Sequence, residues 1–257
     1  MNEELLKILA CPYDRFDLEL RDFISSGEEI ISGKLICKSC GREYHIRNSI
    51  PNFLVCMEID NKHWKRGERV WNKDFISKVL TKLKVKENEI VTEGFTLDVG
   101  CGENPRGDVN LDCYIPSRIP KNFILGSAEK LPFKEKSFDV IRSSYVIEHL
   151  LDPVNFIRQC VDMAKKKVII ITDNSDWLGE IFFRLVGSGR IFHDEHYYKW
   201  SVEYMRNLLK RLGLNATVKP CNLSPTLIVK LLSSLGILPR IGVLFYRDIY
   251  VEVRTSR

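Results

Sequence analysis

The residues best suited to chemistry lie in one short stretch, residues 94–105, where an apolar segment ends in an acid and enters a turn with two glycines. Because glycine has no Cβ, the backbone at Gly100 and Gly102 can bend sharply and a ligand can approach the main chain. An ordinary tight turn after a strand would look similar. A second strand-like segment, 108–112, also ends in an acid, Asp112, a residue type that accepts hydrogen bonds from ribose hydroxyls. The pair indicates a nucleotide-type cofactor.

Three more motifs follow in order: Gly-Ser-Ala-Glu-Lys-Leu-Pro-Phe at 126–133, Ser-Phe-Asp-Val-Ile at 137–141, and Glu-His-Leu at 148–150. The whole series resembles the class I S-adenosylmethionine-dependent methyltransferases over roughly residues 94–257. A nicotinamide-binding turn is the competing interpretation. It requires G-x-G-x-x-G, and Pro105 stands where the third glycine belongs.

The resemblance implies a role for each motif. Asp98 would hold the ammonium group of S-adenosylmethionine, Asp112 would bind its ribose, and Ala128 with Glu129 would line the adenine. Where Ser127 stands, the family usually has an aspartate that accepts a hydrogen bond from the adenine amine. A serine can still accept, but its contact with the adenine is expected to be weaker. Without a cofactor, Asp98 would cap the turn and Asp112 would end a strand in solvent. The implied cofactor-binding set is Asp98, Gly100, Cys101, Gly102, Asp112, Ser127, Ala128, Glu129 and Ser144.

No residue is identified as the catalyst by the sequence. A sulfonium is already activated, so the protein must supply alignment and, for a protonated acceptor, a general base. The candidates follow the predicted strands: Tyr145, His149 and His196, the last in an aromatic segment, 193–200. Enzymes of this class that methylate nucleobase amines usually carry an Asn/Asp-Pro-Pro-aromatic motif where this chain has Arg-Ser-Ser-Tyr at 142–145. This difference argues against the exocyclic amines of adenine and guanine and against glutamine amides as acceptors, and leaves oxygen, carboxylate and ring-carbon or ring-nitrogen acceptors open.

A second group of chemically active residues lies near the N-terminus. Two thiol-bearing turns about 25 residues apart are typical of a zinc ribbon. The second turn is complete, with Cys37 and Cys40 followed by glycine. In the first turn, Cys11 is present but Asp14 replaces the second cysteine. A carboxylate can ligate zinc, so Cys11, Asp14, Cys37 and Cys40 form a candidate metal site. Alternatively, the metal is lost and the cysteines are small buried hydrophobes.

This segment, residues 1–56, resembles the small zinc-ribbon activator that partners several translation-related methyltransferases. The shared pattern is an apolar helix, C-P-x-C, C-x-x-C and a closing I-P-x-L-like stretch; Asp14 departs from it. The expected organisation is therefore a zinc-ribbon-like domain at 1–56, a basic helical connector at 57–93 and a methyltransferase domain at 94–257.

Alternating strand-like and helix-like segments after residue 94 predict an α/β, doubly wound, mostly parallel sheet, and the resemblance implies seven strands. Nine residues separate Gly102 from Asp112, too few for a full first helix. Asp152 with Pro153 marks one helix start, and Ser201 with Gly213 brackets another. The expected strands include 122–125, 137–143, 168–172 and 248–253, and the expected helices are 153–164 and 201–212.

The connector is the most basic segment, with nine Lys and Arg against five Asp and Glu over residues 61–95. A helical apolar stripe runs from Trp71 to Leu83. Upstream, Lys62, Lys65 and Arg66 flank Trp64, an arrangement that suits RNA phosphates with a stacking base. The same residues would also suit the solvated face of a helix.

Composition sets the remaining bounds. The chain has 257 residues, a net charge of +5 and eight cysteines. Its acidic N-terminus lacks a signal peptide, which favours a cytoplasmic protein with thiols as ligands or core residues. Residues 223–245 are apolar but interrupted by Pro and Lys, so no transmembrane span is expected. The oligomeric state is not specified.

Two interpretations of the acceptor remain. The first, which the sequence slightly favours through the aromatic 193–200 and apolar 223–245 segments, is a methyltransferase acting on a small molecule. The second is an RNA- or translation-factor-directed methyltransferase with its activator fused in cis, supported by the ribbon-like head and basic connector. A non-catalytic adaptor is a third reading, which the intact glycine turn argues against.

Overall fold

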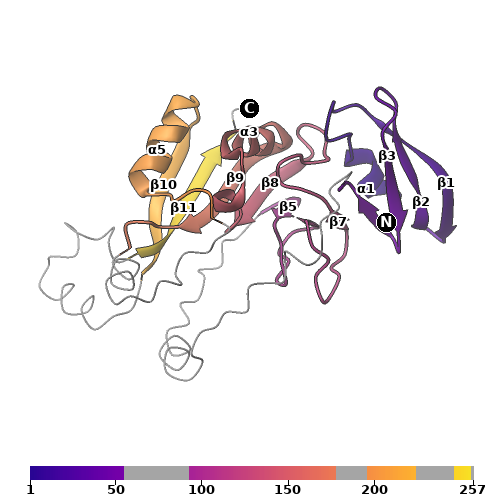
Figure 1. Cartoon of the computed structure of the whole chain (residues 1–257), viewed down its shortest axis with the longest axis horizontal. Helices are drawn as coiled ribbons and strands as arrows, with labels where there is room; N and C mark the ends of the chain where they lie inside the picture. Colours follow the sequence, from indigo (N-terminus) through magenta and orange to yellow (C-terminus); the bar gives the residue numbers. More distant parts are fainter. Residues whose placement is uncertain (55–92, 178–195, 224–245, 256–257) are drawn as a thin grey trace, which may run out of the picture.

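The computed structural model describes residues 1–54, 93–177, 196–223 and 246–255. Their strands form one eleven-stranded sheet in the order β1-β2-β3-β4-β7-β6-β5-β8-β9-β11-β10 (Figure 1). The predicted connector helix and basic cluster, the start of the 193–200 segment and most of the 223–245 segment lie outside the described residues.

Seven strands of this sheet form the predicted methyltransferase core. They are β5 (Thr96–Val99), β6 (Val109–Asp112), β7 (Phe123–Leu125), β8 (Phe138–Ser144), β9 (Ala164–Asp173), β10 (Ala216–Leu223) and β11 (Tyr246–Arg254). Strands β5 to β9 pair in parallel, whereas β11 runs antiparallel to both β9 and β10. The chain builds outward from β5 in both directions, so the point between β5 and β8 is a topological switch point, where open α/β sheets bind ligands. The predicted doubly wound, mostly parallel sheet is confirmed.

Local sequence explains where the core helices begin and end. The α3 helix (Pro153–Met163) has Pro153 in its first turn, and the Asp152 carboxylate accepts a hydrogen bond from Asn155 N. The α5 helix (Val202–Arg211) is capped by Ser201 and followed by Gly213 at φ +71°. A short 3-10 helix, η1 (Ile147–His149), follows β8. The crossover between Gly102 and Asp112 contains turns and no helix, as its length predicted.

Two core strands differ from expectation. Strand β9 begins at Ala164, immediately after α3, because Ala164 already pairs with Phe138 across a β-bulge. Strand β10 was not predicted, since Pro220 interrupts its sequence. It lies at the edge of the sheet, where proline is tolerated because the outer side needs no ladder hydrogen bond.

The N-terminal head consists of α1 (Glu3–Ile8) and four antiparallel strands: β1 (Leu18–Ser26), β2 (Glu29–Cys37), β3 (Glu43–Arg47) and β4 (Ile50–Asn52). Instead of forming an independent sheet, β4 pairs in parallel with β7, and Phe53 N donates to Leu125 O at 2.8 Å. This pairing covers the unpaired edge of β7, so the head extends the core sheet (Figure 1).

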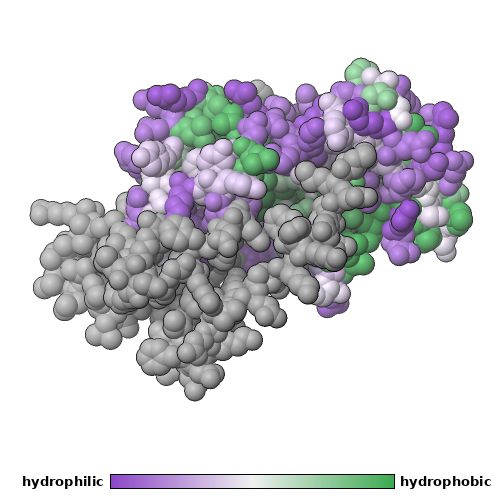
Figure 2. Space-filling model, viewed as in Figure 1, coloured by the Kyte–Doolittle hydropathy of each residue, from purple (hydrophilic) through white to green (hydrophobic). Residues whose placement is uncertain are grey.

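Apolar packing joins the head to the core as well. Leu9, Leu35 and Tyr44 of the head belong to the same buried cluster as Leu131 and Phe133 of the core. On the face shown in Figure 2, the described surface is mostly hydrophilic with apolar patches between. Within the described ranges, no helix has the length and apolar character needed to cross a membrane.

Candidate active site

The turn after β5 is held by two backbone hydrogen bonds and one carboxylate. Gly100 N and Cys101 N both donate to Leu111 O, at 2.8 and 3.2 Å, and Gly102 N donates to Asp112 Oδ2 at 2.8 Å. Gly100 has φ +71°, and a Cβ there would lie 2.1 Å from Val146 Cγ2. The turn therefore contacts the segment that follows β8. Gly102 has φ +51° and open space around it, where a ligand can approach the main chain.

Asp98 lies inside β5 and has partners within the chain. Its Oδ1 is 3.4 Å from Arg142 Nε, and both side chains are about 6% exposed. Its Oδ2 accepts a hydrogen bond from Arg106 N at 2.8 Å. Burial raises the pKa of Asp98, opposed by Arg142 and Arg106. The carboxylate thus connects the start of the turn to β8 and to the loop beyond Gly102.

The carboxyl ends of β6 and β7 meet at Asp112. Its Oδ1 accepts from Tyr114 N at 3.0 Å, and its backbone oxygen accepts from Gly126 N at 2.9 Å. The Asp112 carboxylate therefore stands between the β5 turn and the loop after β7. Each carboxylate oxygen has a second lone pair, so Asp112 retains acceptor capacity toward a ligand hydroxyl.

The loop after β7 carries the predicted adenine-lining residues. Ser127 Oγ accepts a hydrogen bond from Glu129 N at 3.2 Å, so the serine shapes the loop. The Glu129 carboxylate accepts from Leu151 N, just before α3. Ala128 packs against the hydrophobic core. This loop is attached both to Asp112, through Gly126, and to the segment after η1.

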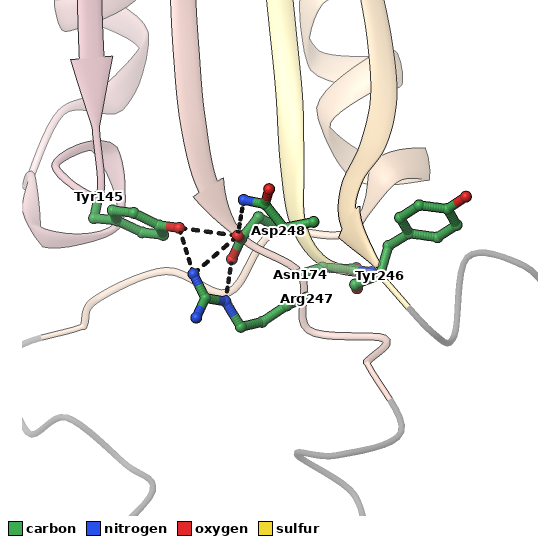
Figure 3. Close-up of polar contacts among 6 residues, drawn as sticks. Tyr145, Asn174, Tyr246, Arg247 and Asp248 are labelled. Atoms are coloured by element: carbon green, nitrogen blue, oxygen red, sulfur yellow. Dashed lines mark hydrogen bonds and ion pairs between the residues drawn. The ribbon is translucent and has the colours of Figure 1, made fainter. Parts of the chain in front are cut away.

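The segment after β8 carries Ser144, which is partly buried, and Tyr145, which has φ +57°. The Tyr145 hydroxyl donates to Asp248 Oδ2 at 2.9 Å and accepts from Arg247 Nη2 at 2.8 Å, so the two side chains converge on the fully buried Asp248 (Figure 3). Arg247 also donates to both Asp248 oxygens, and Asn222 Nδ2 is a further donor. These contacts fix Tyr145. Burial and the charge of Asp248 raise the pKa of its hydroxyl, and Arg247 only partly opposes them.

Two predicted catalytic candidates, His149 and His196, lie together. Their ring centroids are 4.5 Å apart in an edge-to-face arrangement, beside Glu148. Glu148 is 1% exposed, and its Oε2 accepts from Thr172 Oγ1 at 3.0 Å. Burial raises the pKa of Glu148 to about 8. Tyr145 belongs instead to the Asp248 cluster, so the three candidates fall into two groups.

Several residues of the site were not found by sequence reasoning. Arg142 gives no signal beyond a charge within an apolar strand, and its partner Asp98 depends on the β5–β8 register. Gly107 lets its loop pack closely against the backbone of β5, since an added Cβ would lie 2.7 Å from Asp98 N. Arg247 and Asp248 lie about a hundred residues beyond Tyr145 in sequence.

The head brings all four predicted metal ligands together. One ligand atom from each of Cys11, Asp14, Cys37 and Cys40 lies within 4.8 Å of the others. Cys11 Sγ is 3.8 Å from Cys40 Sγ, and Cys37 Sγ is 3.4 Å from Asp14 Oδ1. Ser39 N and Cys40 N point to Cys37 Sγ at 3.4 and 3.5 Å, which orients that sulfur. Three sulfurs and one carboxylate fit a structural zinc ion in donor type and number.

The carboxyl and the Cys37 thiol of this cluster have shifted pKa values. Desolvation raises the pKa of the Asp14 carboxyl, but hydrogen bonds from Cys11, the Phe16 amide and the other two cysteines more than offset it, so the pKa lies below its usual range. Burial raises the pKa of Cys37 to about 11. A metal ion would replace the thiol protons as the partner of the carboxylate.

Comparison with known proteins gives two family matches. Residues 112–172 match the model of a methyltransferase domain. Residues 2–49 match the model of the Trm112p-like proteins. No curated protein sequence matches the chain.

The solved structures that are similar to this chain include two methyltransferases and a complex of a methyltransferase activator. An S-adenosylmethionine-dependent methyltransferase from Thermotoga maritima has 14% identity, covers 65% of this chain and 84% of its own, and gives a TM-score of 0.46. A complex containing the Haloferax volcanii Trm112 methyltransferase activator has 13% identity, coverage of 71% and 88%, and a TM-score of 0.43. The magnesium protoporphyrin IX methyltransferase of Synechocystis has 15% identity, coverage of 70% and 82%, and a TM-score of 0.42.

The methyltransferase-domain match, on a doubly wound sheet, shows that the chain contains a methyltransferase domain, as the sequence motifs predicted. More particularly, the chain carries a Trm112p-like domain in front of that methyltransferase domain. The cofactor of such a domain is S-adenosylmethionine. Neither acceptor hypothesis is favoured by the comparisons.

Proposed function

We propose that this chain binds S-adenosylmethionine at the ends of β5, β6 and β7 and transfers its methyl group to a small-molecule acceptor held beyond β8 and β9. We assign residues 1–56 to the head, 57–93 to the connector and 94–257 to the methyltransferase domain. The observation that carries the proposal is the convergence of two turns on Asp112, the turn after β5 through Gly102 N and the loop after β7 through Gly126 N.

The residues present fit this cofactor. The open, positive-φ position at Gly102 permits close approach to the main chain, and Asp112 offers acceptor lone pairs for ribose hydroxyls. The loop at 127–129 would line the adenine. The remaining predicted contacts are Asp98, Gly100, Cys101 and Ser144. In this proposal Asp98 acts by holding the turn through Arg142 and Arg106 N, as well as by its charge.

When bound, the cofactor supplies a methyl group already activated by the sulfonium. The chain's own task is therefore alignment and desolvation of the acceptor. Gly100 lies against Val146, so the donor turn adjoins the segment that carries Tyr145, Glu148 and His149. Tyr145 is fixed by Asp248 and Arg247 and would form one wall of the acceptor pocket. His149 and His196 are the proposed candidates for removing a proton from an oxygen acceptor.

A methyl-transfer assay with labelled cofactor tests this function. Purified full-length protein should label small hydroxyl or carboxyl acceptors from a screened set, and Asp112→Asn should lose that activity. Glu135→Gln is a matched control because Glu135 is exposed and lies outside the site. Labelling that is unaffected by Asp112→Asn would contradict the proposed cofactor site.

An RNA or translation-factor acceptor is the second candidate, supported by the Trm112p-like match and the basic connector. RNA binding should weaken with salt, with a log–log slope of about −0.7 per phosphate contact for single strands. Replacing Lys65 and Arg66 by alanine should flatten the slope by about one to two units. Filter binding to total RNA measures both effects. A small-molecule enzyme predicts neither effect.

A further inference from the structure

Glu148, His149 and His196 form a compact group of metal-binding side chains outside the head. One ligand atom from each lies within 4.8 Å of the other two. In a tetrahedral zinc site, ligand atoms about 2.0–2.2 Å from the metal stand about 3.3–3.6 Å apart. The separations of the three atoms exceed that range by at most about 1.2 Å. The group draws on two parts of the chain, the η1 helix and the start of the described segment 196–223.

One oxygen of the buried Glu148 carboxylate has no hydrogen-bond partner among the described residues. Glu148 Oε2 accepts from Thr172 Oγ1, but Glu148 Oε1 is buried and has no hydrogen-bond partner among the described residues. An unpaired buried carboxylate oxygen is costly, and a bound cation would satisfy it. This unpaired oxygen is an observation separate from the clustering, and a bound cation would give it a partner.

Outer contacts hold the ligands in place. Thr172 in β9 orients the Glu148 carboxylate through its hydroxyl. Tyr197 N and Tyr198 N both donate to Glu148 O, at 2.9 and 3.2 Å, which attaches the segment carrying His196 to η1. Metal sites characteristically have such supporting hydrogen bonds behind their ligands.

Further carboxylates surround the group. Asp173 and Asp248 both interact electrostatically with Glu148, which adds negative charge to its surroundings. The cation Arg247 is bound to Asp248 and to the Tyr145 hydroxyl. The positive charge of Arg247 is therefore paired with Asp248.

We propose that Glu148, His149 and His196 bind a divalent transition-metal ion of the zinc type. Two imidazoles and one carboxylate suit Zn²⁺, Co²⁺ or Fe²⁺, whereas Mg²⁺ and Ca²⁺ prefer oxygen ligands throughout. Three protein ligands leave a coordination position open. Resting on the proposed function, we assign that position to an acceptor oxygen, because Val146 of the same segment contacts the donor turn at Gly100.

Cobalt titration of metal-stripped, full-length protein tests the site. Co²⁺ bound in the head gives thiolate charge-transfer absorption, whereas Co²⁺ at the new site gives only ligand-field bands because it has no sulfur ligand. The expected result is two separable spectral components. His196→Ala and Glu148→Gln should weaken the second component at least about tenfold and keep the thiolate component. His45→Ala, at an exposed histidine in β3, is the matched control and should change neither.

Three results would overturn the proposal: a single thiolate-containing component in the wild type, a second component that survives both variants, or equal losses in the His45 control. In the first case, the histidine pair would act in proton transfer without a metal. Cofactor binding is measured by calorimetry on the same samples and should be retained in His196→Ala. Failure of the wild type to bind cofactor would contradict the proposed function while leaving the cobalt result intact.

Discussion

The head and the core each gather chemically active side chains, but by different means. In the head, four ligands come from two short turns, and their local spacing is visible in the sequence. In the core, Asp112, Gly102 and Gly126 meet only because parallel strands place their carboxyl ends at one edge of the sheet. The head therefore depends on ligand chemistry, whereas the core depends on backbone conformation and register.

Removing metal from the head should give the largest effect. A ligand bound only by the folded state stabilises it by about 4 kcal/mol when free ligand exceeds its Kd a thousandfold. A chelator, or Cys37→Ser, should therefore lower the thermal midpoint of the head strongly. Asp14→Cys should retain zinc, because a fourth sulfur completes the usual site. Metal-free protein that melts at the same temperature with and without chelator would show that the head folds by packing alone.

Gly100→Ala should give the next largest effect, in the core. The new Cβ meets Val146 Cγ2 at 2.1 Å and adopts a left-handed conformation, so we expect a loss of about 2–4 kcal/mol in the free energy of unfolding. Gly102→Ala is the matched control, because it shares the positive φ but has open space and should cost about 1 kcal/mol. Chemical denaturation measures both. Equal losses would show that backbone conformation alone determines the cost.

A smaller effect is expected where the two regions are joined. Arg15 of the head donates to Leu131 O at 2.7 Å and to Gln159 Oε1 at 2.8 Å. Hydrogen bonds to charged groups contribute about 1.5–3 kcal/mol, and those of Arg15 are only partly shielded from solvent, so Arg15→Ala should cost about 1–2 kcal/mol. Arg21→Ala is the control, because Arg21 pairs with Glu19 inside the head. No difference between the two variants would place the head–core coupling in the β4–β7 pairing and apolar packing.

The same contrast explains what the sequence could predict. Local signals were reliable: Asp152 and Ser201 do cap the two core helices, and the short crossover after Gly102 contains no helix. Contacts that depend on tertiary register were not accessible. Asp98 was assigned to the cofactor by resemblance, whereas its pairing with Arg142 follows from the β5–β8 register.

Two other features required the three-dimensional arrangement. The pairing of β4 with β7 has no local sequence signal, because it depends on an unpaired strand edge in a distant part of the chain. Likewise, Asp248 reaches Tyr145 only because β11 lies beside β9 in the sheet. The predicted cofactor residues, by contrast, lie near strand ends and in the turns that follow, where the sequence shows the glycines and acids of each motif separately.

Isothermal calorimetry with S-adenosylmethionine tests the central claim, that the turns around Asp112 form the cofactor site, most directly. The wild-type chain should bind with a Kd in the range typical of metabolite sites, about 1–100 μM. Asp112→Ala should weaken binding by about 1.5–3 kcal/mol, the scale of a lost charged hydrogen bond, and Glu135→Gln should leave it unchanged. The absence of binding to the wild type, or full binding to Asp112→Ala, would contradict the account.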